Sequence, residues 1–120
     1  MIRILAVDDS RTMRSMIEGA LTGAGFDVHL AEDGIDGLEK LGSSDPDLII
    51  TDINMPRMDG FGFIDGVRKR ARRATVPILV LTTESGDHLK QRARDAGATG
   101  WIVKPFDEQK LVSIIHRLVV

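Results

Sequence analysis

The stretch LAVDDS, residues 5–10, runs from a short apolar segment directly into two adjacent aspartates. The apolar residues are typical of a buried strand, so Asp8 and Asp9 stand where that strand ends. Two like charges at the edge of a protein core are costly unless a cation lies near them. The sequence therefore predicts a cation beside this acidic pair, and the ends of other strands are where its neighbours are expected.

Segments with the composition of buried strands recur along the chain. Several are continuously apolar, as expected for parallel strands that are covered on both faces. They are residues 3–7, 27–31, 47–51, 77–82 and 100–104. The segments between them have helical spacing, because apolar residues repeat on one helical face at Met13, Met16, Ile17, Ala20 and Leu21, and again at Leu111, Ile114, Ile115 and Leu118.

Signals for the starts and stops of helices agree with this division. Ser10 and Asp107 are predicted helix N-caps, and Gly23, Gly25 and Gly97 fall where helices are expected to stop. Strand and helix thus alternate five times, which predicts an α/β fold. The expected architecture is a parallel sheet with right-handed crossovers and helices on both of its faces.

Composition excludes several classes of protein. A length of 120 residues predicts one domain, residues 1–120. The net charge of −2 argues against a general nucleic-acid binder, and the lack of cysteine excludes disulfides and thiolate metal sites. No apolar run suggests a signal peptide or a membrane span, so we expect a cytoplasmic protein. The basic run RKRARR, residues 68–73, is interpreted as the solvated end of a helix.

The strand ends carry the residues that suggest chemistry. In open parallel sheets, ligands bind beyond the carboxyl ends of the strands. Asp52 follows the third predicted strand, Thr82 ends the fourth and Lys104 ends the fifth. Together with Asp8 and Asp9 they form a set of oxygen ligands and one ammonium, which suits Mg²⁺ and a phosphoryl group.

Within this set, the two kinds of aspartate suggest different roles. Asp52 stands alone on its strand and is the better candidate for a nucleophile that forms an acyl phosphate, whereas Asp8 and Asp9 suit metal binding. The alternative for each residue taken singly is structural, because aspartates at strand ends commonly form caps and turns. That alternative weakens when all of these groups meet at one sheet edge.

Four motifs give the chain a family resemblance: VDDS (7–10), TDINMPRMDG (51–60), VLTTES (80–85) and WIVKPF (101–106). In this order and spacing they resemble the response-regulator receiver domain over essentially the whole chain. The resemblance implies a flavodoxin-like, doubly wound sheet of five strands in the order 2-1-3-4-5, with five helices. It also implies that Asp52 accepts a phosphoryl group from a phosphohistidine on a sensor kinase.

The same resemblance implies roles for the other site residues. Mg²⁺ is bound by Asp9, Asp52 and the backbone carbonyl of Asn54, with Asp8 assisting through water. Thr82 and Lys104 bind the phosphoryl oxygens. Asn54 and Glu84 occupy positions that tune dephosphorylation, and this pair implies a phosphoryl group that lasts seconds to minutes.

Trp101 stands where the family usually has a switch tyrosine or phenylalanine, so its inward rotation on activation does not follow from the resemblance. Two interpretations of this sole tryptophan stay open: it belongs to the switch surface that faces a partner, or it fills the core. The resemblance implies that partners bind around residues 86–97 and 100–118.

The stretches DDSRTMR (8–14) and TDINMPRMDGF (51–61) resemble chemotaxis regulators of the CheY type in particular. This implies a monomer that is phosphorylated by a CheA-like histidine kinase. Its output partner is then a flagellar motor switch protein or a phosphatase, with no nucleic acid and no membrane insertion. The alternative is a phosphate sink for the kinase without motor binding. Because the sequence ends at HRLVV (116–120), no output domain is expected.

Three rival interpretations follow from the same residues. Haloacid-dehalogenase-like aspartyl phosphatases share the nucleophile, Mg²⁺ and lysine, but need a second aspartate where this chain has Asn54, whose amide cannot shuttle a proton. A flavodoxin-type electron carrier needs a loop of Ser, Thr and Gly after the first strand, where this chain has Asp8 and Asp9. The third is a receiver cut from a larger DNA-binding regulator.

Overall fold

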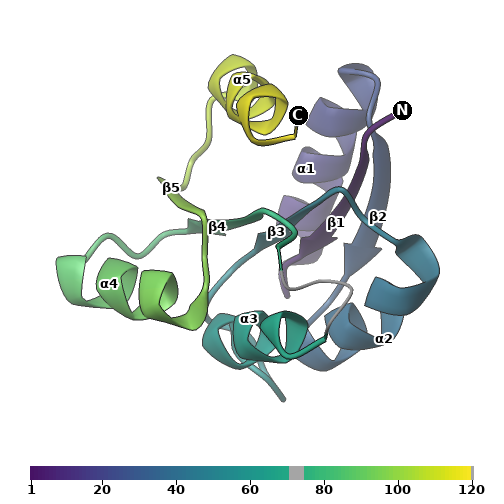
Figure 1. The fold of residues 1–120 in the computed structure, drawn as a ribbon. Coiled ribbons are helices and arrows are strands. Elements are labelled where there is room, and N and C mark those ends of the chain that lie inside the picture. The colour runs from purple at the N-terminus through teal and green to yellow at the C-terminus, as the bar shows by residue number, and fades with distance from the viewer. Residues whose placement is uncertain (71–74, 120) are drawn as a thin grey trace.

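Strands and helices alternate along the chain (Figure 1). The computed structural model describes residues 1–70 and 75–119. Within them the elements are β1 (Arg3–Val7), α1 (Arg11–Gly23), β2 (Asp27–Ala31), α2 (Gly34–Ser44), β3 (Leu48–Thr51), α3 (Gly60–Arg68), β4 (Ile78–Thr82), α4 (Asp87–Ala96), β5 (Gly100–Val103) and α5 (Glu108–Leu118).

The strands form one sheet in the order β2-β1-β3-β4-β5, and every neighbouring pair is parallel. This confirms the predicted α/β fold and its strand order. The predicted strand boundaries hold to within one residue, since Asp47, Pro77 and Lys104 lie just outside β3, β4 and β5. The sheet therefore places the residues that follow β1, β3, β4 and β5 along the same edge.

Helices cover both faces of the sheet (Figure 1). Residues of α1 and α5 pack on one face, and residues of α2, α3 and α4 pack on the other. The alternate residues of β1 separate these two cores, because Leu5 and Val7 belong to one of them and Ile4 and Ala6 to the other. Burial on both faces explains why β1, β3 and β4 are so apolar.

The predicted helix signals have clear outcomes. Ser10 accepts a hydrogen bond from the Met13 backbone N–H, and Asp107 accepts one from that of Lys110, so both N-caps are confirmed. Met16 was predicted on the buried face of its helix, and this is wrong because it is 51% exposed. The buried stripe of α1 is narrower than the sequence suggests and runs through Ile17, Ala20 and Leu21.

The basic run RKRARR is also different from its prediction at one position. Arg68, the last residue of α3, donates hydrogen bonds to the carbonyls of Val76 and Gly97 and is only partly exposed. The predicted solvated character holds for Lys69 and Arg70, which are exposed, whereas residues 71–73 lie outside the described residues.

In the described part of the chain, no helix has the length and apolar character that crossing a membrane requires.

A close approach of backbones sets the position of α3. A Cβ atom at Gly60 would collide with the carbonyl oxygen of Asp52, and the Gly60 N–H donates to the Ile53 carbonyl at 2.8 Å. Only glycine allows the first turn of α3 to pack this tightly against the end of β3. The glycine of the TDINMPRMDG motif thus has a steric explanation.

Candidate functional site

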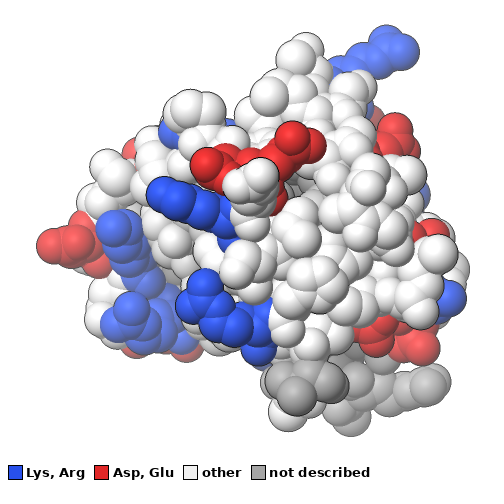
Figure 2. All heavy atoms as spheres, turned by 90° about the horizontal axis from the view of Figure 1, so that it is seen from above, with Lys and Arg blue, Asp and Glu red and all other residues white. Residues whose placement is uncertain are grey.

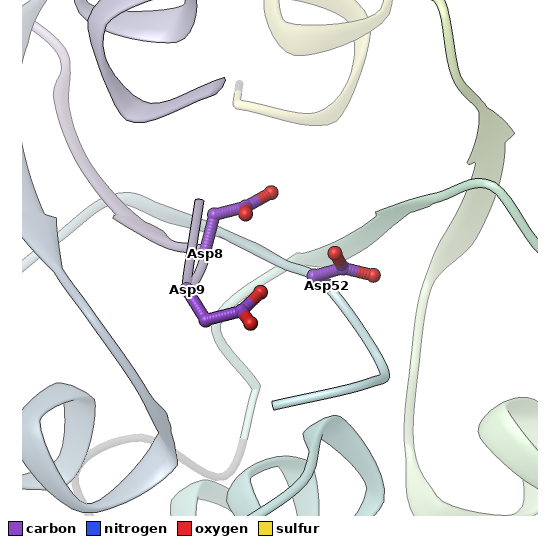
Figure 3. Close-up of side chains that lie close together, drawn as sticks. All are labelled: Asp8, Asp9 and Asp52. Atoms are coloured by element: carbon purple, nitrogen blue, oxygen red, sulfur yellow. The ribbon is translucent and has the colours of Figure 1, made fainter. Parts of the chain in front are cut away.

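Three carboxylates meet at the carboxyl edge of the sheet (Figure 3). Asp8 and Asp9 follow β1, and Asp52 follows β3, the strand that pairs with β1. One oxygen from each of the three side chains lies within 4.8 Å of the others. Asp8 and Asp52 are buried and Asp9 is exposed, so the cluster is open to solvent on the side of Asp9.

Lys104 supplies a cation to this cluster. Its Nζ donates to Oδ2 of Asp8 at 2.7 Å and to Oδ2 of Asp52 at 2.9 Å, and its side chain is 9% exposed. The sequence predicted a cation beside Asp8 and Asp9, and the ammonium of Lys104 is one such cation. Three carboxylates still face this one ammonium, and the cluster keeps an excess of acidic groups.

The surroundings shift the titration of two of these groups. Burial raises the pKa of the Asp8 carboxyl, although hydrogen bonds from Lys104 and from the Ser10 N–H oppose the shift. Burial also acts against the charged form of Lys104, but its bonds to Asp8 and Asp52 outweigh that cost and raise the pKa of the ammonium. The lysine is thus held in its charged form, whereas the charge on Asp8 is destabilised.

The Asp52 carboxylate is held by both of its oxygens. Oδ1 accepts a hydrogen bond from the Ile53 N–H at 2.6 Å, and Oδ2 accepts from Lys104. The backbone is fixed as well, because the Asp52 N–H donates to the Val7 carbonyl at 3.0 Å. Each carboxylate oxygen has two lone pairs, so an oxygen bound once can still act on a ligand.

Thr82 ends β4 as predicted, and it is fully buried. Its hydroxyl accepts a hydrogen bond from the Glu84 N–H at 3.4 Å. Among the described residues, this hydroxyl makes no hydrogen bond with the acidic cluster. Of the two predicted phosphoryl-binding residues, Lys104 therefore bonds to Asp52 and Thr82 does not.

Asn54, Glu84 and Trp101 form a connected set that the sequence did not reveal. The Asn54 side-chain amide donates to the Glu84 carboxylate at 3.0 Å, and the Trp101 indole N–H donates to the Glu84 backbone carbonyl at 3.0 Å. Trp101 is partly buried and packs against one core cluster. The loops after β3 and β4 are thereby tied to each other and to β5.

Sequence reasoning missed two further contacts near the site. Arg14 donates to the Asp8 backbone carbonyl at 2.8 Å, and Arg57 forms an ion pair with the buried carboxylate of Asp33. No spacing or motif predicts either contact, because the first depends on how the β1–α1 loop turns and the second on how the β3–α3 loop packs against the start of α2. Arg57 lies inside the TDINMPRMDG motif, which was the only signal available for it.

The donor set decides what the cluster can bind. Carboxylate oxygens without nitrogen or sulfur ligands suit a hard divalent cation such as Mg²⁺. The adjacent ammonium of Lys104 suits a phosphoryl oxygen. The arrangement is an acidic cluster that could bind a divalent cation, with an ammonium beside it, at the carboxyl edge of a doubly wound α/β sheet.

This class of site and fold has a counterpart among known families. The family model described as "Response regulator receiver domain" matches residues 4–116. The chain therefore belongs to the response regulator receiver domain family. This family differs from the haloacid-dehalogenase and flavodoxin alternatives that the residues left open.

Relatives and solved structures narrow the comparison. The chemotaxis protein CheY1 of Helicobacter pylori is 42% identical over 112 residues, which cover 92% of this chain and 90% of that protein. The sensor histidine kinase CheAY of the same organism is 35% identical over 116 residues, 95% of this chain but 14% of the kinase.

Two solved structures have the same fold. Chemotaxis protein CheY4 of Vibrio cholerae has a TM-score of 0.94 and 43% identity, with 98% of each chain covered. The receiver domain of sensor histidine kinase PA1611 from Pseudomonas aeruginosa has a TM-score of 0.91 and 28% identity, with coverage of 98% and 97%. That structure is described with a magnesium ion coordinated in the active site cleft.

Proposed function

We propose that this chain is a phosphoreceiver of a chemotaxis two-component system, in which Asp52 accepts a phosphoryl group from a phosphohistidine. The observation that carries the proposal is the contact of Asp52 with Lys104 inside the cluster of Asp8 and Asp9. A CheA-like histidine kinase is the proposed donor. Residues 1–120 act as one receiver unit, which catalyses only its own phosphorylation and dephosphorylation.

In the proposed reaction, a carboxylate oxygen of Asp52 attacks the phosphorus atom. The new O–P bond forms as the N–P bond of phosphohistidine breaks, and the electron pair of that bond stays on the imidazole nitrogen. The hydrogen bonds from Ile53 and Lys104 orient the carboxylate for this attack. Lys104 also neutralises a phosphoryl oxygen, and the Thr82 hydroxyl turns toward the phosphoryl group once it is attached.

The oxygen ligands of the cluster fit Mg²⁺ as the proposed cofactor. Asp9, Asp52 and the Asn54 carbonyl would hold the ion, with Asp8 assisting through water. When bound, Mg²⁺ offsets negative charge on the phosphoryl oxygens. The solved receiver domain that is described with magnesium in its active site cleft supports this assignment.

The proposed output is a change in a surface formed by α4, β5 and α5. In Figure 2, basic side chains gather on the left, the side on which Figure 1 places α4. This helix carries Lys90, Arg92 and Arg94, and a small pocket beside it is lined by Lys90, Arg94 and Trp101. Such a surface suits an acidic partner segment with an apolar anchor, and the proposed partner is a motor switch protein or a phosphatase.

The Asn54–Glu84 contact supports a short-lived phosphoryl group. This hydrogen bond is exposed and Asn54 lies two residues after Asp52, so in this proposal the two side chains influence the approach of water to an acyl phosphate. We expect a lifetime of seconds to minutes in Mg²⁺. A phosphoryl group that survives overnight in Mg²⁺ would contradict this expectation.

The test is incubation with acetyl phosphate and Mg²⁺, followed by intact-mass spectrometry. Wild type is expected to gain one phosphoryl group and Asp52→Asn none. Asp65→Asn, on the exposed side of α3, is the matched control and is expected to behave as wild type. If acetyl phosphate and a phosphorylated CheA-like kinase both fail to modify wild type, the proposed function is wrong.

A second experiment separates motor output from a phosphate sink. Purified phosphorylated protein is tested for binding to a flagellar motor switch protein and, separately, for back-transfer to the kinase. Binding that depends on phosphorylation favours motor output. Rapid back-transfer without binding favours the sink.

A further inference from the structure

The loop between β3 and α3 rests on the start of α2. The Gly34 N–H donates to the Met58 carbonyl at 3.2 Å, and a Cβ atom at Gly34 would lie 2.7 Å from Cγ of Met58. The first half of the same loop holds Asp52 and Asn54. A contact that fixes the second half therefore also restricts where these two residues lie.

A bidentate ion pair reinforces this contact. Arg57 Nε lies 2.7 Å from Asp33 Oδ2, and its Nη2 lies 3.0 Å from Oδ1. The Asp33 side chain is 4% exposed and also accepts the Asp36 N–H at 2.9 Å as the N-cap of α2. Paired N–H donors of a guanidinium fix both the distance and the orientation of a carboxylate.

The backbone of Arg57 is in an unfavourable conformation. Its φ is +65°, in the left-handed region that non-glycine residues other than asparagine and aspartate rarely adopt. Such a conformation persists where surrounding contacts impose it, and it is concentrated near functional sites. Here the guanidinium is bound to Asp33 and the next residue is bound to Gly34, so the loop is held from two neighbouring residues.

We propose that Arg57 is a positioning residue for divalent-cation binding. Its ion pair with Asp33 fixes the β3–α3 loop so that Asp52 and Asn54 face Asp8 and Asp9 together. Arg57 itself touches neither the acidic cluster nor Lys104 through any hydrogen bond or ion pair among the described residues. The inference rests on the proposed function, because it concerns the cation that this function requires.

Positioning by Arg57 and the simple effect of its charge predict opposite changes in cation affinity when Arg57 is replaced, so the inference can be tested. Arg57→Asn removes a positive charge from an acidic protein, so long-range electrostatics would strengthen cation binding. Asparagine accepts a positive φ, so the loop can keep its backbone conformation. Loss of positioning would instead weaken binding, by about tenfold for a partner that orients metal ligands from outside.

The experiment is a titration with Mn²⁺, followed by electron paramagnetic resonance of the free ion, with Mg²⁺ as competitor. We expect Arg57→Asn and Arg57→Gly to raise the Kd by about tenfold, and Arg57→Lys to recover part of the loss. Lys69→Asn removes an equal charge from an exposed ion pair of α3 and is expected to leave the Kd unchanged or slightly lower.

A double-mutant cycle identifies the ion pair as the cause. Asp33→Asn keeps an oxygen that can cap α2, and Asp33→Asn combined with Arg57→Asn is expected to bind no more weakly than Arg57→Asn alone. Melting curves of every variant show that the fold is retained.

The outcomes separate the two proposals. Unchanged or tighter binding by Arg57→Asn and Arg57→Gly would overturn the positioning role and leave the proposed function standing. Absence of saturable Mn²⁺ binding in wild type would overturn both.

Discussion

The two edges of the sheet treat charged side chains in opposite ways. At the amino edge, Arg3 binds Asp27 and the Ser44 carbonyl, and Arg68 binds the Val76 and Gly97 carbonyls, so these cations join neighbouring strands. At the carboxyl edge, Lys104 pairs with two carboxylates of a cluster that holds three. The charges at the amino edge are paired with neighbouring groups, whereas the carboxyl edge keeps an excess of negative charge that a bound divalent cation would relieve.

The pKa shifts of the aspartates also differ between the two edges. Hydrogen bonds from His29 and then Arg3 lower the pKa of Asp27, while burial raises that of Asp8. A lowered carboxyl pKa means that folding stabilises the charge, and a raised one means that folding opposes it. Retained destabilisation of this kind is typical of functional sites, where stability is given up for binding.

Lys104→Ala is expected to have the largest effect on stability. It leaves the buried carboxylates of Asp8 and Asp52 facing each other without their shared cation, which we expect to lower the free energy of unfolding by about 3 kcal/mol. Millimolar Mg²⁺ should restore much of that loss, and the variant should still be phosphorylated but with a weakened output. Urea unfolding with Mg²⁺ and with EDTA measures this, and an equal loss in both would contradict it.

Arg68→Ala tests the amino edge. Removal of the guanidinium leaves the Val76 and Gly97 carbonyls without that donor, and we expect a loss of about 2 kcal/mol. Mg²⁺ should not restore this loss, because the affected contacts lie at the opposite edge from the acidic cluster. Urea unfolding is the measurement, with Lys69→Ala as the exposed control. Restoration by Mg²⁺ would show that the two edges are coupled.

Asp9→Asn sharpens the contrast with a smaller change. It removes one carboxylate from the overcharged cluster, so we expect the apoprotein to gain about 0.5 kcal/mol. Mg²⁺ affinity and the rate of phosphorylation should both fall. Thermal melts with and without Mg²⁺ test the first point, and a variant that is less stable than wild type without the metal would refute it.

The smallest expected effect is on the pH dependence of stability. The pKa of Asp8 is raised in the folded state. Its contribution to the free energy of unfolding is therefore fully present below the pKa of the unfolded state, and it is lost as the pH rises through the pKa of the folded state. The pKa of Asp27 is lowered in the folded state. Its contribution to the free energy of unfolding is therefore present above the pKa of the unfolded state, and it is lost as the pH falls through the pKa of the folded state.

Two variants measured in EDTA separate these contributions. The stability of Asp8→Asn relative to wild type should increase from acid pH toward neutrality. That of Asp27→Asn should decrease over the same range. If the relative stabilities of the two variants changed with pH in the same direction, the pKa values of Asp8 and Asp27 would not be shifted in opposite directions.

Local patterns in the sequence account for the elements and for much of the site. Short runs rich in apolar residues locate the strands to within one residue, and the end of β1 predicts that Asp8 and Asp9 need a cation. The proximity of Asp52 and Lys104 follows from the rule that parallel strands end at one edge. These inferences succeed because they depend on spacing and composition.

Contacts between distant loops are beyond such rules. Arg68 was taken as solvated because its neighbours are charged, yet its position depends on Gly97, 29 residues away. Met16 fits the helical repeat and is nevertheless exposed, because α1 buries a stripe narrower than its apolar pattern. The ion pair of Arg57 and Asp33 requires the loop after β3 to meet the start of α2, which no periodicity encodes.

The bond between Lys104 and Asp8 joins residues that are 96 positions apart. Closing a loop of this length costs conformational entropy, and the cost is smaller when the chain between the two residues is already ordered. The carboxylates follow β1 and β3, whereas their lysine follows β5, the last strand of the sheet. Docking of β5 completes the site, and a chain whose last strand has detached keeps its carboxylates but loses the ammonium that orients Asp52.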